Sequence, residues 1–352
     1  MKEIIIDNRK IGPDHHPYII AELSANHNGD INRAFKIIEM AKECGADAIK
    51  LQTYRPDTIT MKSDSPEFLI KGGLWNGKTL YDLYEEAHMP WDWHKPLFTK
   101  AKELGITIFS SPFDFTAVDL LESLGAPAYK IASFEAIDLP LIEYVAKTGK
   151  PMIISTGMAN EEEIREAVDT ARSAGCKELV VLHCVSGYPA PSEDYNLVTI
   201  PDMATRFGVL TGLSDHTIDN TTAITSVALG ACLIEKHVTL NREGGGPDDS
   251  FSLEKPELMQ LCRDSKIAWR ALGKINYERK ESEKGNALFR RSLYVVKNIA
   301  EGEVFTCENV RSIRPGFGLL PKYYGAVLGK KAKKNIPAGT ALKHEFLDMK
   351  IV

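Results

Sequence analysis

Residues 209–238 read VLTGLSDHTIDNTTAITSVALGACLIEKHV. Two apolar runs in this stretch each end in polar residues that close on a histidine, His216 and His237. A strand that stays apolar until its last residues and then presents Ser, Lys, Glu or His is typical of a (β/α)8 barrel, which carries its active site at the carboxyl ends of its strands. The stretch therefore predicts two neighbouring barrel strands whose histidines lie side by side.

The same pattern recurs along the chain and indicates the fold class. Strands are predicted at 18–24, 48–53, 107–111, 128–133, 152–156, 179–185, 209–214 and 232–238. Helices are predicted at 31–44, 92–104, 115–124, 139–148, 161–174, 219–230 and 256–271, with one further short helix in the proline-containing segment 189–207. Eight strands that alternate with helices favour a closed parallel barrel over an open doubly wound sheet, and no Gly-x-Gly-x-x-Gly motif follows the first strand.

The chain has 352 residues, more than the roughly 250 residues of a barrel alone, so we expect a second, smaller domain. Residues 1–273 carry the barrel pattern, and residues 274–289 are charged and polar, as in an exposed linker. Residues 290–352 contain short strands and turns. The predicted fold is an α/β (β/α)8 TIM barrel followed by a small C-terminal β-rich domain.

Residues 55–94 form the longest interruption of the barrel pattern and contain Trp75, Trp91 and Trp93. Aromatic residues in a long loop above a barrel mouth commonly form a lid or a specificity wall, and plain hydrophobic packing is the alternative. We take the three tryptophans as candidates for packing on a substrate.

Composition excludes several classes of protein. The net charge of −5 argues against general nucleic-acid binding, which needs a basic excess. Six cysteines without a Cys-x-x-Cys pair are expected to be free thiols in a reducing compartment. The N-terminus is charged too early for a signal peptide, and no apolar run reaches the roughly 18 residues of a membrane span. We expect a cytoplasmic protein that binds neither nucleic acid nor membranes.

His216 and His237 are the first candidates for chemistry. Neutral imidazole is a good ligand for Mn, Zn or Fe, and a site with only two protein ligands leaves positions open for water and substrate. Each histidine alone could equally form a hydrogen bond at the barrel rim. Because the two are predicted to be adjacent, we favour a metal site.

Lysines form the second candidate group, because Lys50, Lys130 and Lys236 lie at the ends of predicted strands. Burying a lysine in an apolar strand is costly unless an anion meets it, so three lysines that converge on one barrel mouth predict a small polyanionic ligand. The alternatives are lysines that reach solvent or pair with glutamates, and a Schiff-base aldolase. Glu22, at the end of the first strand, is either an acid–base catalyst or a salt-bridge partner of a lysine.

Ordered motifs along almost the whole chain resemble the sialic acid synthase family. They are Ile-Ala-Glu-Leu-Ser-Ala-Asn-His at 20–27, Ile-Lys-Leu-Gln-Thr at 49–53, Ser-Ser-Pro-Phe-Asp at 110–114, Tyr-Lys-Ile-Ala-Ser-Phe-Glu at 129–135, Ser-Thr-Gly-Met at 155–158, Leu-His-Cys-Val-Ser-Gly-Tyr-Pro at 182–189, Gly-Leu-Ser-Asp-His-Thr at 212–217 and Ile-Glu-Lys-His-Val-Thr at 234–239. The tail, with Ser-Ile-Arg-Pro-Gly at 312–316, resembles the family's antifreeze-like (SAF) domain. The resemblance implies condensation of phosphoenolpyruvate with an amino sugar to give a nine-carbon 2-keto acid.

The resemblance also implies roles for individual residues. His216 and His237 would hold Mn or Mg, and Glu22 would be the catalytic carboxylate. The residues implied to bind phosphoenolpyruvate are Lys50, Ser111, Lys130, Ser133, Ser155 and Ser214, and Ser186 is a further candidate hydroxyl donor. The residues implied to face the sugar are Gln52, Glu135, Tyr188, Glu235 and Asp248. Arg314 matches the arginine that the family's C-terminal domain inserts into the partner subunit's barrel, which implies a domain-swapped homodimer.

Three segments distinguish branches of this family. Residues 74–84, 90–94 and 245–253 are more similar to the pseudaminic acid synthases than to the N-acetylneuraminate synthases. This implies that the amino sugar is 2,4-diacetamido-2,4,6-trideoxy-L-altrose, with an N-acetylneuraminate or legionaminate synthase as the alternative. A non-catalytic binding protein is a further alternative, and the predicted cations and histidines at the barrel mouth argue against it.

Overall fold

The structure is a computed structural model that describes residues 3–348. Within this range the chain divides into two compact units, one that ends at Gly273 and one that begins at Lys274.

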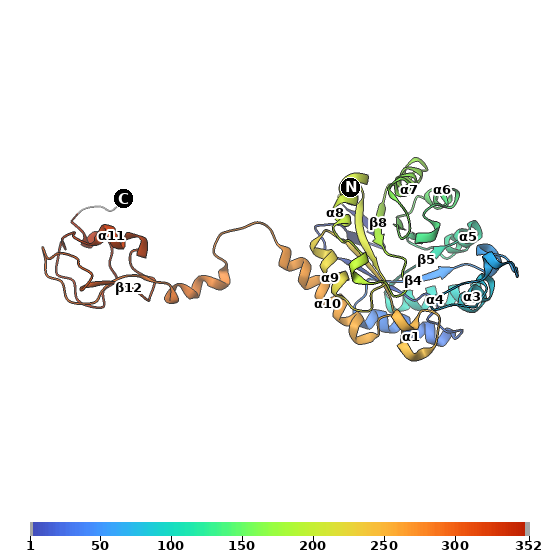
Figure 1. Ribbon diagram of the computed structural model, residues 1–352, viewed down its shortest axis with the longest axis horizontal. Coiled ribbons are helices and arrows are strands. Elements are labelled where there is room, and N and C mark those ends of the chain that lie inside the picture. The colour runs from blue at the N-terminus through green and yellow to red at the C-terminus, as the bar shows by residue number, and fades with distance from the viewer. Residues whose placement is uncertain (1–2, 349–352) are drawn as a thin grey trace. The chain divides into compact units, whose positions relative to one another are not determined.

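The first unit is built around a closed barrel, for which the described residues supply eight parallel strands (Figure 1). Around the barrel the strands follow the order β10, β3, β4, β5, β6, β7, β8, β9. Their bounds are β3 Tyr18–Glu22, β4 Ala48–Thr53, β5 Thr107–Pro112, β6 Tyr129–Ile131, β7 Met152–Ser155, β8 Leu179–Cys184, β9 Leu210–Asp215 and β10 Leu233–His237. The predicted barrel and its strands are therefore confirmed, with small differences at the strand ends.

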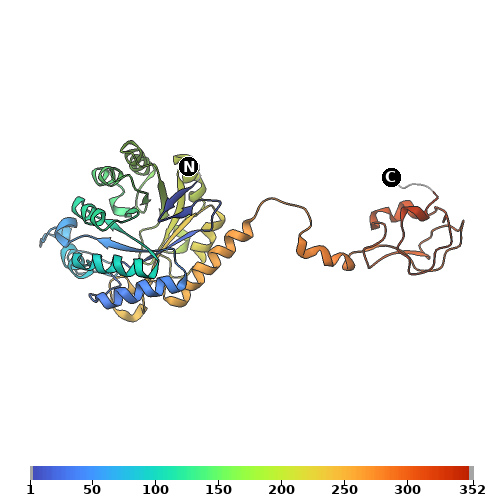
Figure 2. The same cartoon turned by 180° about the vertical axis from the view of Figure 1, so that it is seen from behind.

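Helices cover the outside of this barrel (Figure 1). Their bounds are α1 Ile31–Cys44, α4 Trp91–Leu104, α5 Phe115–Ser123, α6 Leu139–Ala146, α7 Glu161–Ser173, α8 Thr199–Phe207, α9 Thr221–Ala228 and α10 Lys255–Leu272. Helix α1 shows why they form, because Ala34, Ile37, Ile38 and Ala41 place its buried residues on one face. Helix α10 packs beside α1 and so brings the end of the barrel unit back to its beginning, as both views show (Figures 1 and 2).

An N-terminal hairpin, which the sequence pattern did not predict, covers the start of the barrel. Strands β1 Ile4–Ile6 and β2 Arg9–Ile11 pair antiparallel. Ile4, Ile6 and Ile11 are buried and share a core cluster with Tyr18 and other residues at the strand beginnings. Since the hairpin occupies the amino-terminal end, substrates reach the barrel at its carboxyl end.

The long segment 55–94 contains two short helices, α2 Pro56–Ile59 and α3 Leu80–Ala87. Thr79 caps α3 by accepting a hydrogen bond from the backbone N–H of Asp82. The predicted interruption is thus partly ordered by regular structure, and it supplies one wall of the site described below.

The second unit contains the antiparallel strands β11 Ser292–Val295 and β12 Val310–Ile313 and the short helix α11 Tyr324–Val327. Its core includes Leu293, Phe305 and Leu342. A 3-10 helix over Glu281–Phe289 lies in the segment predicted to be a linker.

The six cysteines all lie in the described part of the chain and none of them forms a disulfide, as predicted. Five are buried and Cys307 is exposed. Across residues 3–348, no helix combines the length and apolar character needed to cross a membrane.

Candidate active site

A pocket of about 320 Å³ lies at the carboxyl ends of the barrel strands. The predicted site residues that line it are Lys50, Gln52, Lys130, Ser133, Glu135, Ser155, Tyr188, Ser214, His216, Glu235, His237 and Asp248. These side chains come from strands β4, β6, β7, β9 and β10 and from the loops that follow the strands. The fold therefore brings most of the predicted site residues to one cavity.

Four predicted residues are not part of the pocket wall. Glu22 is fully buried and contacts Lys50 and Gln52, which do line the wall. Ser111 is also fully buried and accepts a hydrogen bond from Lys50 Nζ at 3.2 Å. Ser186 packs against Gly157, and Arg314 is an exposed residue of the second unit. Glu22 and Ser111 thus lie directly behind the wall.

Alternating charges connect the bottom of this pocket. Lys50 Nζ lies 2.7 Å from Glu22 Oε2 and 3.5 Å from Glu235 Oε1. Lys130 Nζ lies 3.0 Å from Glu235 Oε1 and 3.2 Å from Glu235 Oε2. The parallel register explains the first contact, because Glu22 of β3 is directly opposite Lys50 of β4. Two ammonium groups and two carboxylates therefore form one buried chain, Glu22–Lys50–Glu235–Lys130.

Burial and mutual attraction set the protonation of these four groups. Burial raises the pKa of Glu22, even though Lys50 opposes the shift. Burial alone would lower the pKa of Lys50, but the carboxylates of Glu22 and Glu235 raise it overall. Burial alone would raise the pKa of Glu235, but the positive charges of Lys130 and Lys50 outweigh this effect and lower it overall. Burial lowers the pKa of Lys130. An anion that enters the pocket meets two lysines whose partners are already in place.

Lys236 does not converge with the other two lysines, and this prediction was wrong. Its Nζ lies 2.9 Å from Asp215 Oδ2 and donates hydrogen bonds to the backbone carbonyls of Thr217 and Asp219. Side chains alternate sides along a strand, so Lys236 points away from the pocket that Glu235 and His237 line. It holds the loop that follows His216.

His216 and His237 lie side by side, with ring centroids 5.3 Å apart, as predicted. His216 Nδ1 is 2.8 Å from the carbonyl oxygen of Val185. His237 Nδ1 is 3.2 Å from Ser24 Oγ. Burial lowers the pKa of His237 well below its ordinary value, so this imidazole is neutral and able to act as a ligand.

A metal between the two histidines is compatible with these contacts. A ligating histidine usually donates its second ring N–H to a carbonyl or another acceptor, which is what Val185 offers to His216. Among residues 3–348 no cluster of three or more His, Cys, Asp or Glu side chains has the arrangement of a metal site. The histidine pair could therefore hold a cation only with water or substrate as its remaining ligands.

Comparison with known proteins assigns this site to a family. Residues 37–277 match the NeuB family, and residues 290–347 match the SAF domain. The chain belongs to the NeuB family. Its barrel is thus a NeuB barrel, and its second unit contains a SAF domain.

Three curated relatives cover nearly all of the chain. The pseudaminic acid synthase of Campylobacter jejuni (strain 81-176) is 46% identical over 94% of this chain and 96% of its own length. The pseudaminic acid synthase of Helicobacter pylori is 44% identical over 94% of this chain and 98% of its own length. The N,N′-diacetyllegionaminic acid synthase of Campylobacter jejuni (strain ATCC 700819) is more distant. It is 38% identical over 90% of this chain and 96% of its own length.

A solved structure supports the fold. The N-acetylneuraminic acid (sialic acid) synthetase from Leptospira borgpetersenii, in complex with citrate, has a TM-score of 0.73 and 31% identity. The match covers 82% of this chain and 96% of that one.

Tryptophans of the NeuB barrel divide between the pocket and the packing around it. Trp75 lines the pocket, donates a hydrogen bond from Nε1 to the carbonyl of Pro247 at 3.3 Å, and lies 5.9 Å from the Tyr188 ring. Trp91 and Trp93 are not among the lining residues. Trp91 stacks with Arg55 and Trp93 packs edge-on to His27. Plain packing, the alternative reading of the aromatic residues, therefore applies to these two.

Several apolar and aromatic residues of the NeuB pocket were not predicted. They are Tyr54, Ile59, Leu83, Tyr84, Phe113 and Phe134. Tyr54 and Phe113 follow the ends of β4 and β5 directly, and this position after a barrel strand is the signal that could have identified them. The others come from segment 55–94 or from a short turn, whose direction the sequence pattern does not define.

Two further carboxyl groups of the NeuB pocket have raised pKa values. Burial raises the pKa of Glu135 to about 7, and its Oε2 is a buried atom without a hydrogen-bond partner among the described residues. Burial also raises the pKa of Asp248. Glu135 can therefore donate a proton to a ligand near neutral pH, as groups that hold a polar substrate often do.

Proposed function

We propose that this protein is a pseudaminic acid synthase. The proposed reaction condenses phosphoenolpyruvate with 2,4-diacetamido-2,4,6-trideoxy-L-altrose and gives pseudaminic acid and phosphate. The observation that carries the proposal is the pair of buried lysines at the bottom of a pocket with polar and aromatic walls. Identity of 46% and 44% to two pseudaminic acid synthases, against 38% to a legionaminate enzyme, supports the choice of sugar.

Lys50 and Lys130 are proposed to bind the carboxylate and phosphate of phosphoenolpyruvate. Ion pairs with Glu22 and Glu235 fix both lysines in position before the substrate arrives, and for Lys50 these carboxylates outweigh the effect of burial on its pKa. The hydroxyls of Ser133, Ser155 and Ser214 line the same pocket, Ser111 lies behind it, and Ser186 packs against Gly157. Ser155 Oγ is buried without a protein partner, which suits a group that waits for a ligand oxygen.

His216 and His237 are proposed to hold a divalent metal, Mn or Mg. Enzymes of the sialic acid synthase family are generally metal-dependent. When bound there, the metal would polarise the aldehyde oxygen of the open-chain sugar. Asp248 Oδ2 lies 3.8 Å from His237 Nδ1, and this carboxyl group is proposed to face the sugar.

The proposed chemistry forms one C–C bond and breaks one C–O bond. C3 of phosphoenolpyruvate attacks the sugar aldehyde, and water adds at C2. The tetrahedral intermediate then loses phosphate by C–O cleavage. The two lysines stabilise the negative charges of the carboxylate and the phosphate, which lie close together throughout these steps. Glu22, buried next to Lys50 and Gln52, is proposed as the catalytic carboxylate that orients water or moves a proton through these two neighbours.

The sugar is proposed to occupy the side of the pocket formed by the loops. Gln52, Glu135, Tyr188, Glu235 and Asp248 would provide its hydrogen bonds. The altrose derivative has a methyl group at C6 and acetamido groups at C2 and C4. Trp75, together with Tyr84 of the same segment, provides apolar surface for these groups.

Assembly and location are part of the proposal. We propose a barrel domain at 1–273, a linker at 274–289 and a SAF domain at 290–352. Arg314, exposed on the SAF unit, is proposed to reach the barrel of a partner subunit in a domain-swapped homodimer. The enzyme is proposed to act in the cytoplasm and to bind neither nucleic acid nor membranes.

Phosphate release from phosphoenolpyruvate tests the proposed reaction. The assay offers the altrose sugar, N-acetylmannosamine and the legionaminate precursor in parallel, each with Mn and with EDTA. Metal-dependent release with the altrose sugar alone is expected. Release with another sugar instead would replace the substrate and keep the chemistry, whereas a borohydride-trapped lysine adduct would overturn the mechanism in favour of an aldolase.

A further inference from the structure

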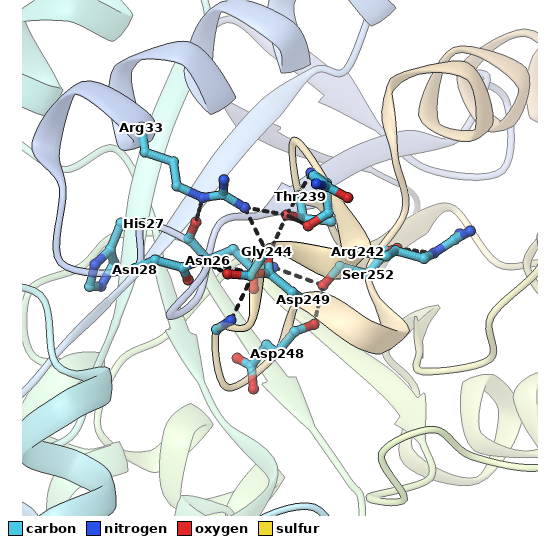
Figure 3. A network of polar contacts seen from close by, with 12 residues as sticks. Asn26, His27, Asn28, Arg33, Thr239, Arg242, Gly244, Asp248, Asp249 and Ser252 are labelled. Carbon is cyan, nitrogen blue, oxygen red and sulfur yellow. Dashed lines mark hydrogen bonds and ion pairs between the residues drawn. The ribbon is translucent and has the colours of Figure 1, made fainter.

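Asp248 and Asp249 are consecutive, yet their side chains face opposite environments. Asp248 lines the pocket. Asp249 is 1% exposed and enters a polar network beside the barrel mouth, whereas Asp248 points away from that network (Figure 3). The two residues belong to a 3-10 turn, for which Asp248 is the N-terminal cap and Asp249 the first residue.

Both carboxylate oxygens of Asp249 accept hydrogen bonds from residues distant in sequence. Oδ1 accepts from Arg33 Nη2 at 3.0 Å and from the Thr239 hydroxyl. Oδ2 accepts from Asn28 Nδ2 at 2.8 Å and from the backbone N–H of Gly246 at 2.9 Å. A buried carboxylate with this many donors, one of them a guanidinium, is held firmly in one position.

A second set of bonds holds the other end of the same loop. Asn26 Nδ2 donates to the carbonyl of Val238 at 2.9 Å and to Ser252 Oγ at 2.8 Å. Ser252 Oγ in turn donates to the backbone carbonyl of Asp248 at 2.7 Å. The loop between Val238 and Ser252 is therefore anchored on residues 26–33 at two places (Figure 3).

Glycines permit this close approach. A Cβ at Gly246 would lie 1.9 Å from Asn28 Oδ1, and a Cβ at Gly244 would lie 2.5 Å from Asp249 Oδ2. No side chain larger than hydrogen fits at either position unless the network moves. The close approach of Asp249 and Asn28 thus explains Gly244 and Gly246, and a positive φ of 79° explains Gly245 between them.

The anchored loop contributes two residues to the pocket wall, and a third packs against residues of that wall. Pro247 and Asp248 line the wall, and Pro247 accepts the hydrogen bond from the Trp75 indole. The Phe251 ring lies 5.1 Å from His237 and 5.4 Å from Tyr188. By contrast, the two pocket lysines belong to strands β4 and β6 and not to this loop.

We propose that Asp249, held by Arg33 and Asn28, is a positioning residue for the sugar. It fixes the turn that presents Pro247 and Asp248, and it acts through them rather than by touching the substrate. This inference rests on the proposed function of the pocket. It separates the two substrates, because the loop forms part of the sugar-side wall and contributes no residue that is proposed to bind phosphoenolpyruvate.

Asp249→Asn tests the proposal with almost no change in volume. Its amide nitrogen would face either the Asn28 amide and the Gly246 N–H or the Arg33 guanidinium and the Thr239 hydroxyl, so at least one acceptor is lost. A displacement of the loop by a fraction of an ångström is expected to raise the KM for the sugar roughly 10- to 100-fold. The dissociation constant for phosphoenolpyruvate, measured by calorimetry without sugar, is expected to change less than about 2-fold by the same argument. Amide hydrogen exchange of peptides that cover 239–252 should become faster, which reports the loop directly and needs no sugar.

Asp47→Asn is the matched control. Asp47 also pairs with an arginine, 3.4 Å from Arg9 Nε, and accepts a backbone hydrogen bond from Ile19, but it lies at the amino-terminal end of the barrel. It should lower thermal stability without changing the KM for the sugar. If Asp249→Asn does not fold, Asn28→Gly removes the bond to Oδ2 and a longer one to the Gly244 carbonyl, and glycine tolerates the positive φ of 47° at this position. It should give a smaller rise in the sugar KM with the same faster exchange.

The outcomes distinguish this inference from the proposed function. Wild-type protein that is inactive with every sugar tested would overturn the function, and unchanged exchange in Asp249→Asn would overturn the positioning role independently. Wild-type activity together with an unchanged sugar KM in Asp249→Asn would overturn the inference alone. An equal rise in the constants for both substrates would also count against it, because a general structural defect would produce that result.

Discussion

Lys50 and Glu22 form an ion pair of 2.7 Å between neighbouring barrel strands, with 4% and 0% of their side chains exposed. The same ammonium lies 3.5 Å from Glu235, so one lysine balances two buried carboxylates. The site is therefore charged and ordered before any substrate binds.

Lys50→Met should destabilise the barrel strongly. It leaves Glu22 and Glu235 without their shared cation, and breaking a buried pair in this way costs roughly 3–5 kcal/mol in the free energy of unfolding. Urea unfolding at pH 7 measures the loss. Lys147→Met removes an exposed ion pair, in which the side chains of Lys147 and Glu143 are 61% and 50% exposed. It should lower the free energy of unfolding by less than about 1 kcal/mol. Equal losses in the two variants would show that Lys50 is not a buried charge partner.

The double variant Glu22→Gln with Lys50→Met separates stability from binding. It removes the unpaired carboxylate of Glu22 and should recover part of the lost stability. Phosphoenolpyruvate binding should remain weak, because the cation is still missing. Full recovery of binding, measured by calorimetry, would exclude Lys50 as an anion ligand.

Glu135 should make stability depend on pH. Burial raises its pKa to about 7 in the folded chain from an ordinary value of 4.5, so the folded state binds this proton more tightly than the unfolded state. The contribution is fully present below about pH 4.5 and is lost as the pH rises to about 7. Relative to Glu135→Gln, the free energy of unfolding of the wild type should fall by about 2 kcal/mol as the pH rises through this range. The fall is smaller than the whole pKa shift would give, because the side chain is partly exposed to solvent. Urea unfolding of both proteins across this pH range gives the difference, and parallel curves would contradict the assignment.

His216→Ala and His237→Ala should each abolish metal-dependent turnover while the barrel still folds. Each variant removes one of the two imidazoles proposed as ligands. Removing a residue that only holds a metal ligand in place costs roughly 10- to 100-fold in metal affinity, so the loss of a ligand itself should lower manganese affinity by at least this much. Electron paramagnetic resonance of free manganese measures binding without turnover, and circular dichroism checks the fold. A double variant that remains active in EDTA would rule out the metal assignment.

Trp75→Ala should weaken sugar binding selectively. The indole lines the pocket and donates to Pro247, so its loss removes apolar surface and a support of the loop. An increase of roughly 10-fold in the sugar KM is expected for an aromatic contact of this kind. Trp269→Ala alters a tryptophan that is not among the lining residues and also donates to a proline carbonyl, that of Pro13 beside the N-terminal hairpin, and it should leave the sugar KM unchanged. Similar KM values for both variants would remove Trp75 from the sugar wall.

Much of the barrel could be predicted because its information is local. Each strand is a short apolar run that ends in polar residues, and Ile-Glu-Lys-His at 234–237 shows both parts. Parallel pairing of neighbouring strands then places His216 beside His237. The hairpin at Ile4–Ile11 was missed because strands of three residues carry too short a pattern.

The sequence by itself determined the strands, the helices, the family resemblance and which polar residues stand at the strand ends. Only the tertiary structure decided which side chains face the pocket. Glu235 and Lys236 are adjacent, but side chains alternate along β10. Glu235 therefore lines the pocket, whereas Lys236 points away from it and pairs with Asp215 at the end of β9. Trp75 and Trp91, and likewise Asp248 and Asp249, are separated by loop geometry, which depends on contacts such as Arg33–Asp249 between residues more than 200 positions apart. Local patterns define elements, whereas the direction of a loop side chain results from long-range packing.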